Sequence, residues 1–341
     1  MDTIDLYAAA RLGSLGRLPA GELTRERLLA RNAAGHTPLH AIARHGCLRE
    51  LPPGRVTAEL LLVPNDSGYT PLHQAALGGH LDQIPSGLLT SEALLTCSNA
   101  GYTVFHSAAG SGSLGQLPPA LLTPAIGARR THLGNTLVHE AAEHGALDRL
   151  PPGILSASAL LEKNISGETV FHVAALNGHF GQIPPELVTA AALLEKTNAG
   201  DTALHAAAIS GHLETIPAAF LTRDHLTIAS NSGFTAIHAA AETGQLSKLP
   251  PAALTADLLL TRNDNGDTPL HAAAFEGHLD QIPLGLLSAE IFATRNYEGV
   301  TVSRLAVDRG FAEQIPPQFR PKGAGPLKRF LTRLGGSRAP F

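Results

Sequence analysis

The chain has 341 residues, of which 44% are hydrophobic and only 4% aromatic, with no Trp and a formal net charge of −4. The apolar content excludes a chain that is disordered throughout, and the negative charge argues against nucleic acid as a general partner. A single core of this length would normally divide into domains. A repeat array avoids that limit, because each unit packs only on its neighbours.

The first residues and the two cysteines indicate the expected cellular setting. The start MDTIDLYAAARLG lacks the basic and apolar segments of a secretory signal, and no apolar run is long enough to cross a membrane. Cys47 and Cys97 occupy different repeat positions and predict no disulfide framework. We expect a cytoplasmic protein, or an effector delivered by a route not visible in the sequence. The Ala-, Leu- and Arg-rich composition favours a bacterial source.

Residues 1–34 predict an N-terminal capping repeat. The segment carries a partial copy of the pattern that follows, with Gly13, Pro19 and a Tyr, Tyr7, where later copies place His. Departures from the pattern are expected at the end of an array.

Residues 35–298 form eight regular repeats of 33 residues with no insertion. A Gly is followed two residues later by Thr, Thr by His three residues on, and a second Gly and a Pro come further along each copy. Several columns in one register identify a repeat architecture. The histidine column comprises His40, His73, His106, His139, His172, His205, His238 and His271.

The first half of each copy predicts a short helix. The first Gly ends a tight turn that needs a positive φ, Thr is the helix N-cap, and Pro follows it in three copies. The second Gly is placed to end the helix. An apolar column and two Ala columns within it predict closely stacked helices, as in Leu72, Ala75 and Ala76.

The second half of each copy predicts a break and a second short helix. A Leu or Ile precedes the Pro, and a Thr or Ser further on, as at Thr90, is a second N-cap before paired leucines. Residues 124–130 lose the leucine pair and add Gly127, which predicts a local bend or mobile unit.

Two segments follow the regular repeats. Residues 299–320 form a degenerate C-terminal capping repeat with Ser303 and Arg304 in place of the usual pair. Residues 321–341 form a basic tail, in which Leu and Phe recur at helical spacing between Lys328, Arg329 and Arg333. This tail predicts an amphipathic helix that either caps the last repeat or docks to an acidic partner or an anionic membrane.

The motif that begins at Gly68 and reads GYTPLHQAALGGH, and its copy from Gly266, closely resemble the ankyrin repeat, and the period of 33 residues agrees. The resemblance covers residues 1–316 and implies an all-α, ankyrin-like solenoid of about nine full repeats with partial capping units. The chain departs from the family pattern at its Pro and second Thr, so we expect the second family helix to be shortened. By analogy with the family, the histidine column bonds the Thr hydroxyl and the backbone of an adjacent turn.

The sequence gives little support to metal binding or catalysis. A ladder with one His per layer does not converge on an ion, and of His80, His179, His212 and His278 only His179 and His212 lie in adjacent repeats. No phosphate-binding loop or nucleophile and base stands out from the repeat pattern. We therefore expect no enzyme activity, no metal and no cofactor.

Two columns that the repeat leaves variable are the predicted partner-binding residues. The turn column follows the first Gly, and its aromatic members suit an interface. The helix column lies two residues before the second Gly, and its apolar members either form an exposed stripe or pack against neighbouring helices. The candidates are His36, Tyr69, Tyr102, Asn135, Asp201, Phe234 and Asp267 in the turn column, and Leu77, Leu176, Ile209 and Phe275 in the helix column.

These features predict a monomeric, non-catalytic module that binds another protein through the exposed turns and the first-helix face. The alternative is an effector or inhibitor that blocks a target enzyme or docks to an anionic surface through the basic tail. Membrane contact is expected only through Lys328, Arg329 and Arg333, and no contact with nucleic acid is expected.

Overall fold

The computed structural model describes residues 5–151 and 153–320. The predicted helix of the basic tail, with the predicted membrane contact through its basic side chains, lies outside the described residues. The described part is helical. It contains no strands, only four isolated β-bridges, each between a residue that precedes a turn and the Thr that follows it, such as Cys97 and Thr103. No described helix is long and apolar enough to span a bilayer.

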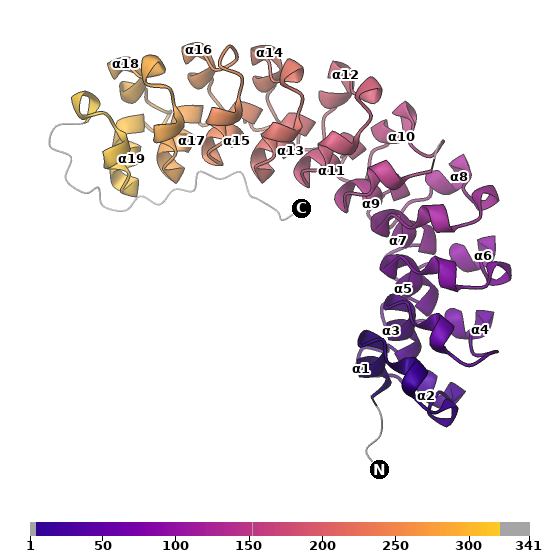
Figure 1. The fold of residues 1–341 in the computed structure, drawn as a ribbon. Helices are drawn as coiled ribbons and strands as arrows, with labels where there is room; N and C mark the ends of the chain where they lie inside the picture. The colour runs from indigo at the N-terminus through magenta and orange to yellow at the C-terminus, as the bar shows by residue number, and fades with distance from the viewer. Residues whose placement is uncertain (1–4, 152, 321–341) are drawn as a thin grey trace. The chain divides into compact units, whose positions relative to one another are not determined.

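The chain divides into two compact units, and Figure 1 labels the helices of both. Unit 1 comprises residues 1–170 and 182–187, and unit 2 comprises residues 171–181 and 188–341. Within unit 1, α1 packs on α3, α3 on α5, α5 on α7 and α7 on α9. Within unit 2, α13 packs on α15, α15 on α17 and α17 on α19. Stacking of consecutive helices confirms the all-α solenoid.

Each repeat begins with a helix of six to eight residues, here called its first helix. The first helices are α1 (Leu6–Arg11), α3 (Pro38–Arg44), α5 (Pro71–Gly78), α7 (Val104–Ser111), α9 (Leu137–Glu143), α11 (Val170–Leu176), α13 (Ala203–Ser210), α15 (Ala236–Glu242), α17 (Pro269–Glu276) and α19 (Val302–Arg309).

The second helix of each repeat is only about one turn long. The second helices are α2 (Arg25–Leu28), α4 (Ala58–Leu61), α6 (Ser91–Leu94), α8 (Pro124–Gly127), α10 (Ala157–Leu161), α12 (Ala190–Leu193), α14 (Arg223–Leu226), α16 (Ala256–Leu259) and α18 (Ala289–Ala293).

Short 3₁₀ helices join the two. Those that follow the first helices are η1 (Leu15–Arg17), η3 (Leu48–Glu50), η4 (Leu81–Gln83), η6 (Leu114–Gln116), η8 (Leu147–Arg149), η9 (Phe180–Gln182), η11 (Leu213–Thr215), η13 (Leu246–Lys248), η14 (Leu279–Gln281) and η16 (Ala312–Gln314). Those that follow the repeat Pro are η2 (Ala20–Glu22), η5 (Ser86–Leu88), η7 (Pro119–Leu121), η10 (Pro185–Leu187), η12 (Ala218–Phe220), η15 (Leu284–Leu286) and η17 (Pro317–Phe319).

The segment between the first and second helices is less helical than we expected. A shortened α-helix was expected before the Thr-capped helix, whereas the structure has a three-residue 3₁₀ helix on each side of Pro85. Pro lacks a backbone N–H and its ring clashes with a preceding helical turn. The predicted second cap is confirmed, since Thr90 Oγ1 accepts a hydrogen bond from the Ala93 amide at 3.2 Å.

The core lies between stacked first helices. The apolar column, which includes Leu72, Phe105 and Ile237, is fully buried, and so are both Ala columns. Side chains no larger than Ala let neighbouring helices approach closely, so a thin layer of Leu, Ile, Val and Phe is enough to exclude water. The first helices therefore form a scaffold on which the turn residues are displayed.

Candidate functional site: the turns and first-helix face

The Thr and His columns fix the start of each first helix. In α5 the Thr70 amide donates to His73 Nδ1 at 3.2 Å, and the His73 amide donates to Thr70 Oγ1 at 3.4 Å. His73 Nε2 lies 3.0 Å from the Tyr102 carbonyl oxygen of the next repeat. Since Nδ1 accepts, Nε2 carries the proton and donates to that carbonyl. One imidazole therefore closes a helix start and joins two repeats.

Burial keeps these histidines neutral. It lowers the pKa of four of them to about 4, because the charged ring would lose its hydration; these are His40, His73, His205 and His238. A neutral ring is what the paired donor and acceptor roles require. Both ring nitrogens of these histidines are therefore used in hydrogen bonds that hold the fold.

Two positions depart from this column in an informative way. Tyr7 occupies the histidine position of the N-terminal repeat, and its hydroxyl donates to the His36 carbonyl oxygen at 2.6 Å, the bond that His Nε2 makes elsewhere. His106 Nε2 bonds instead to the Arg129 carbonyl oxygen at 3.1 Å. This carbonyl belongs to the irregular segment 124–130, which therefore changes the local bonding between repeats.

The turns that precede the first helices are tied to one another. Gly68 has a φ of +79°, and a Cβ there would lie 2.7 Å from the Asn99 backbone nitrogen of the next turn. The Asn99 amide donates to the Ser67 carbonyl oxygen at 2.9 Å. Gly is needed both for the left-handed backbone and for this close approach.

The turn column contributes more to the scaffold than its variability suggests. Asn135 and Asp267 are buried, while the other five candidates are half-buried. An Asn of the next turn bonds to members of this column, with Asn65 Nδ2 3.0 Å from His36 Nε2, Asn164 Nδ2 3.0 Å from Asn135 Oδ1, and Asn296 Nδ2 2.8 Å from Asp267 Oδ1. His36, Asn135 and Asp267 are therefore not free of structural roles, contrary to the reasoning that selected them.

The aromatic members of the turn column lie over the histidines. The Tyr69 and Tyr102 ring centroids are 6.3 Å apart, and each ring meets its own repeat's histidine edge-on. The Phe234 centroid lies 5.2 Å from that of His238. Each ring keeps part of its surface accessible and remains a candidate contact.

The sequence left open whether the apolar residues of the helix column form an exposed stripe or pack against neighbouring helices, and the structure gives an intermediate result. Leu77, Leu176, Ile209 and Phe275 are all half-buried. The Arg309 guanidinium carbon lies 3.8 Å above the Phe275 ring centroid, which covers one face of that ring. A shallow pocket of about 230 Å³ lies beside this column in unit 1, lined by Tyr7, His36, Arg44 and Gln74, among others.

Large apolar side chains at the turn tips were missed by the sequence reasoning. Leu133 is 56% exposed, Ile165 62% and Tyr297 73%. Leu133 and Ile165 occupy the tips of consecutive turns, and the Ile165 amide donates to the Leu133 carbonyl oxygen at 3.0 Å. The signal was present in the repeat register. The position of Ile165 is polar in most other repeats, as at Asp66, Asn99 and Asn198, and the position of Leu133 is small or polar in the other repeats, as at Ser67, Ala100 and Ser232.

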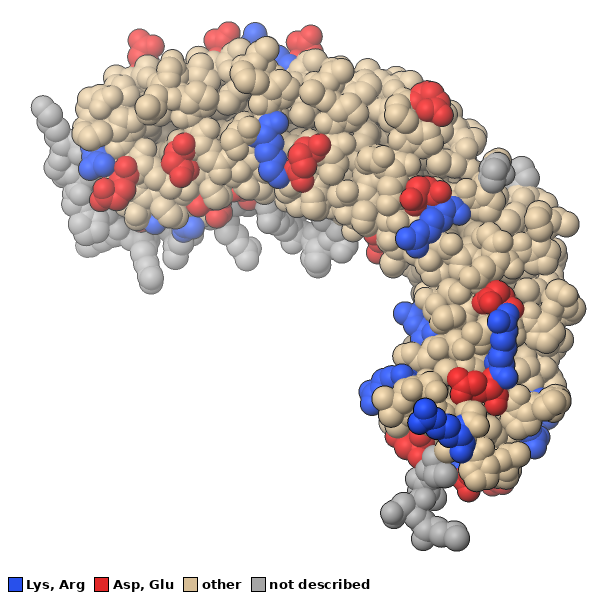
Figure 2. Space-filling view, viewed as in Figure 1, with Lys and Arg blue, Asp and Glu red and all other residues tan. Residues whose placement is uncertain are grey.

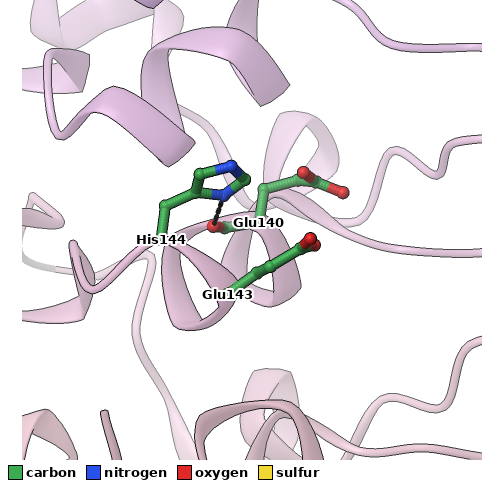
Figure 3. A group of neighbouring side chains, drawn as sticks. All are labelled: Glu140, Glu143 and His144. Carbon is green, nitrogen blue, oxygen red and sulfur yellow. Dashed lines mark hydrogen bonds between the residues drawn. The ribbon is translucent and has the colours of Figure 1, made fainter. Parts of the chain in front are cut away.

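A cluster of potential metal ligands was also missed. Within the described ranges, Glu140, Glu143 and His144 are the one group of three or more such side chains whose ligand atoms lie close together (Figure 3).

Charged side chains are sparse on the face of the molecule drawn in Figure 2, where most of the surface is uncharged. Broad charge attraction is therefore not the main property of this face.

Comparison with known families supports the repeat assignment. Residues 183–249 match a model described as ankyrin repeats in three copies, and residues 265–296 match the single ankyrin repeat. No curated protein matches the chain. Residues 183–296 therefore carry ankyrin repeats, and the described part of the chain is a helical solenoid. Ankyrin repeats generally mediate binding to other proteins.

Proposed function

We propose that the protein binds a partner protein through its turn tips and first-helix face, and that it does so without chemistry of its own. The observation that carries this proposal is the exposed pair Leu133 and Ile165. Two large apolar side chains on adjacent turns, where most other turns carry small or polar residues, form the kind of surface that marks an interaction site.

The scaffold around the pair supports this role. The turns are held by a backbone bond between the two tips and by the Asn164 side chain, which reaches Asn135 in the preceding turn. A partner would therefore meet a preorganised surface and would not have to order a loop, which reduces the cost of binding. Tyr102 and Leu77 add half-buried apolar area elsewhere in unit 1.

The test is capture of partners from the native host by the full chain, with quantitative mass spectrometry. Leu133→Ser with Ile165→Ser should remove the captured partner, because Ser keeps the backbone bond and removes the apolar contact. The matched control changes two exposed leucines of the second-helix and 3₁₀ segments, Leu161→Ser with Leu284→Ser. A partner captured equally by all three proteins would place its binding surface elsewhere and contradict the proposal.

A further inference from the structure

Three side chains with metal-binding atoms gather at the C-terminal end of α9. Glu140, Glu143 and His144 each offer one ligand atom, and these atoms lie within 4.8 Å of one another (Figure 3). Their spacing of three and four residues places them on one face of the helix. A helix C-terminus carries partial negative charge, which favours a cation there.

The His144 ring is held in place by one hydrogen bond and by packing. Its Nδ1 donates to the Glu140 backbone carbonyl oxygen at 3.0 Å, which leaves the lone pair of Nε2 available. Metal-binding histidines typically have their second nitrogen fixed by such a bond. The ring lies against Gly110 of α7, where a Cβ would be 3.3 Å from Nδ1. Gly110 is the one Gly of the helix column in the regular repeats, and it provides the room for the imidazole.

Glu140 is a buried carboxylate held by neutral donors. It is 2% exposed, and Asn135 Nδ2 donates to its Oε1 at 3.1 Å. The Tyr102 hydroxyl also donates to this carboxylate. Neither donor carries a charge, so the pocket supplies no cation of its own to pair with the carboxylate. Asn135 and Tyr102 would then orient a metal ligand.

A buried hydroxyl on the facing helix lacks a hydrogen-bond partner. Ser107 Oγ of α7 is buried and unbonded. Ser107 precedes Gly110 by three residues in α7, so the two lie on the same side of that helix. An unpaired buried hydroxyl is costly.

We propose that Glu140, Glu143 and His144 bind a divalent transition metal ion such as Zn²⁺. One imidazole nitrogen and two carboxylate oxygens form a set suited to Zn²⁺, Mn²⁺ or Fe²⁺. Three protein ligands leave at least one coordination position for water. Glu143 and His144 are exposed, so solvent reaches the site. No other regular repeat has a carboxylate at the position of Glu140, where the chain carries Ala41, Gln74, Ser107, Val173, Ala206, Ala239 and Ala272.

The test uses the full chain after treatment with a chelator, titrated with ZnCl₂ in a calorimeter. We expect one Zn²⁺ per chain, and at least about tenfold weaker binding for Glu143→Gln and for His144→Ala, since each removes a ligand. Both residues are exposed, so neither change should alter the thermal unfolding of the chelated protein.

Matched controls occupy the same repeat positions elsewhere. Glu242→Gln corresponds to Glu143→Gln, and His45→Ala corresponds to His144→Ala. Both should bind Zn²⁺ as the unchanged chain does. Absorption of the Co²⁺-loaded protein should lack thiolate charge transfer, which separates this site from Cys47 and Cys97. No stoichiometric binding, or binding unaffected by Glu143→Gln and His144→Ala, would overturn the proposal.

Discussion

The two units share one scaffold and differ in what they display on it. Both use Thr and His pairs to start their first helices, as His73 and His238 illustrate. At the position of Glu140, however, unit 1 has Ala41 and then the polar residues Gln74, Ser107 and Glu140, whereas unit 2 has Val173 and then only Ala. Unit 1 also carries the exposed pair Leu133 and Ile165. Shared columns therefore define the fold, and the differences between units indicate where function lies.

The largest expected effect is a loss of folding stability in both units as the solution becomes acidic. Buried histidines have a pKa of about 4 against 6.5 for the unperturbed group, so their neutral form stabilises the folded chain fully above pH 6.5. This stability is lost as the pH falls from 6.5 through about 4, by about 1.4 kcal/mol per pH unit for each histidine. Urea unfolding at pH 7, 6 and 5 should show a steep fall in both units. A midpoint independent of pH would contradict the buried, neutral ladder.

Removing one ladder histidine should destabilise its unit by about 2–4 kcal/mol. His238→Ala leaves Thr235 and the Asp267 carbonyl oxygen without their partner and opens a cavity. The control His45→Ala removes an exposed histidine and should change stability by less than about 0.5 kcal/mol. Equal unfolding midpoints in urea for the two variants would mean that the ladder does not hold the repeats together.

Glu140→Gln should stabilise unit 1 at pH 8 by up to about 3 kcal/mol in the presence of a chelator. Burial raises the pKa of Glu140 from 4.5 to about 7, so its favourable contribution is present below pH 4.5 and is lost as the pH rises through 7. Gln keeps the shape without ionising, and the gain should vanish at pH 4.5. Unit 2, with Ala at this position, offers no equivalent gain. If Glu140→Gln were instead less stable than the unchanged chain at pH 8, the hydrogen bonds of the ionised Glu140 would outweigh the cost of burying its charge, which would contradict this prediction.

The sequence predicted the periodic part of the molecule well. The Thr caps, the glycines at helix ends and the Thr-capped second helix followed from local rules that act within a few residues, as at Thr90 and Gly79. The exact form of the Pro segment did not follow, because a helix break does not specify a 3₁₀ turn. The variability of the turn column was also a poor guide to exposure, since Asn135 accepts a hydrogen bond from Asn164, which lies 29 residues later in the chain.

Some other features could be predicted only from contacts between residues that are distant in the sequence. Tyr7 looked like an end substitution, but its hydroxyl reaches the same carbonyl position as a ladder histidine. Glu140 is the one carboxylate at its position in the regular repeats, but only its packing against Tyr102 and Asn135 places it in the interior. The turn tips Leu133 and Ile165 could have been predicted from the sequence, because most other repeats carry small or polar residues at the same two positions.

The most direct test of the central claim is the affinity of the purified, captured partner for variants that change only displayed residues. Leu133→Ser with Ile165→Ser should weaken binding by at least about tenfold, equivalent to about 1.4 kcal/mol, with unchanged unfolding. Leu161→Ser with Leu284→Ser should leave the dissociation constant within about twofold. Undiminished affinity in the first pair, or an equal loss in both pairs, would contradict the account.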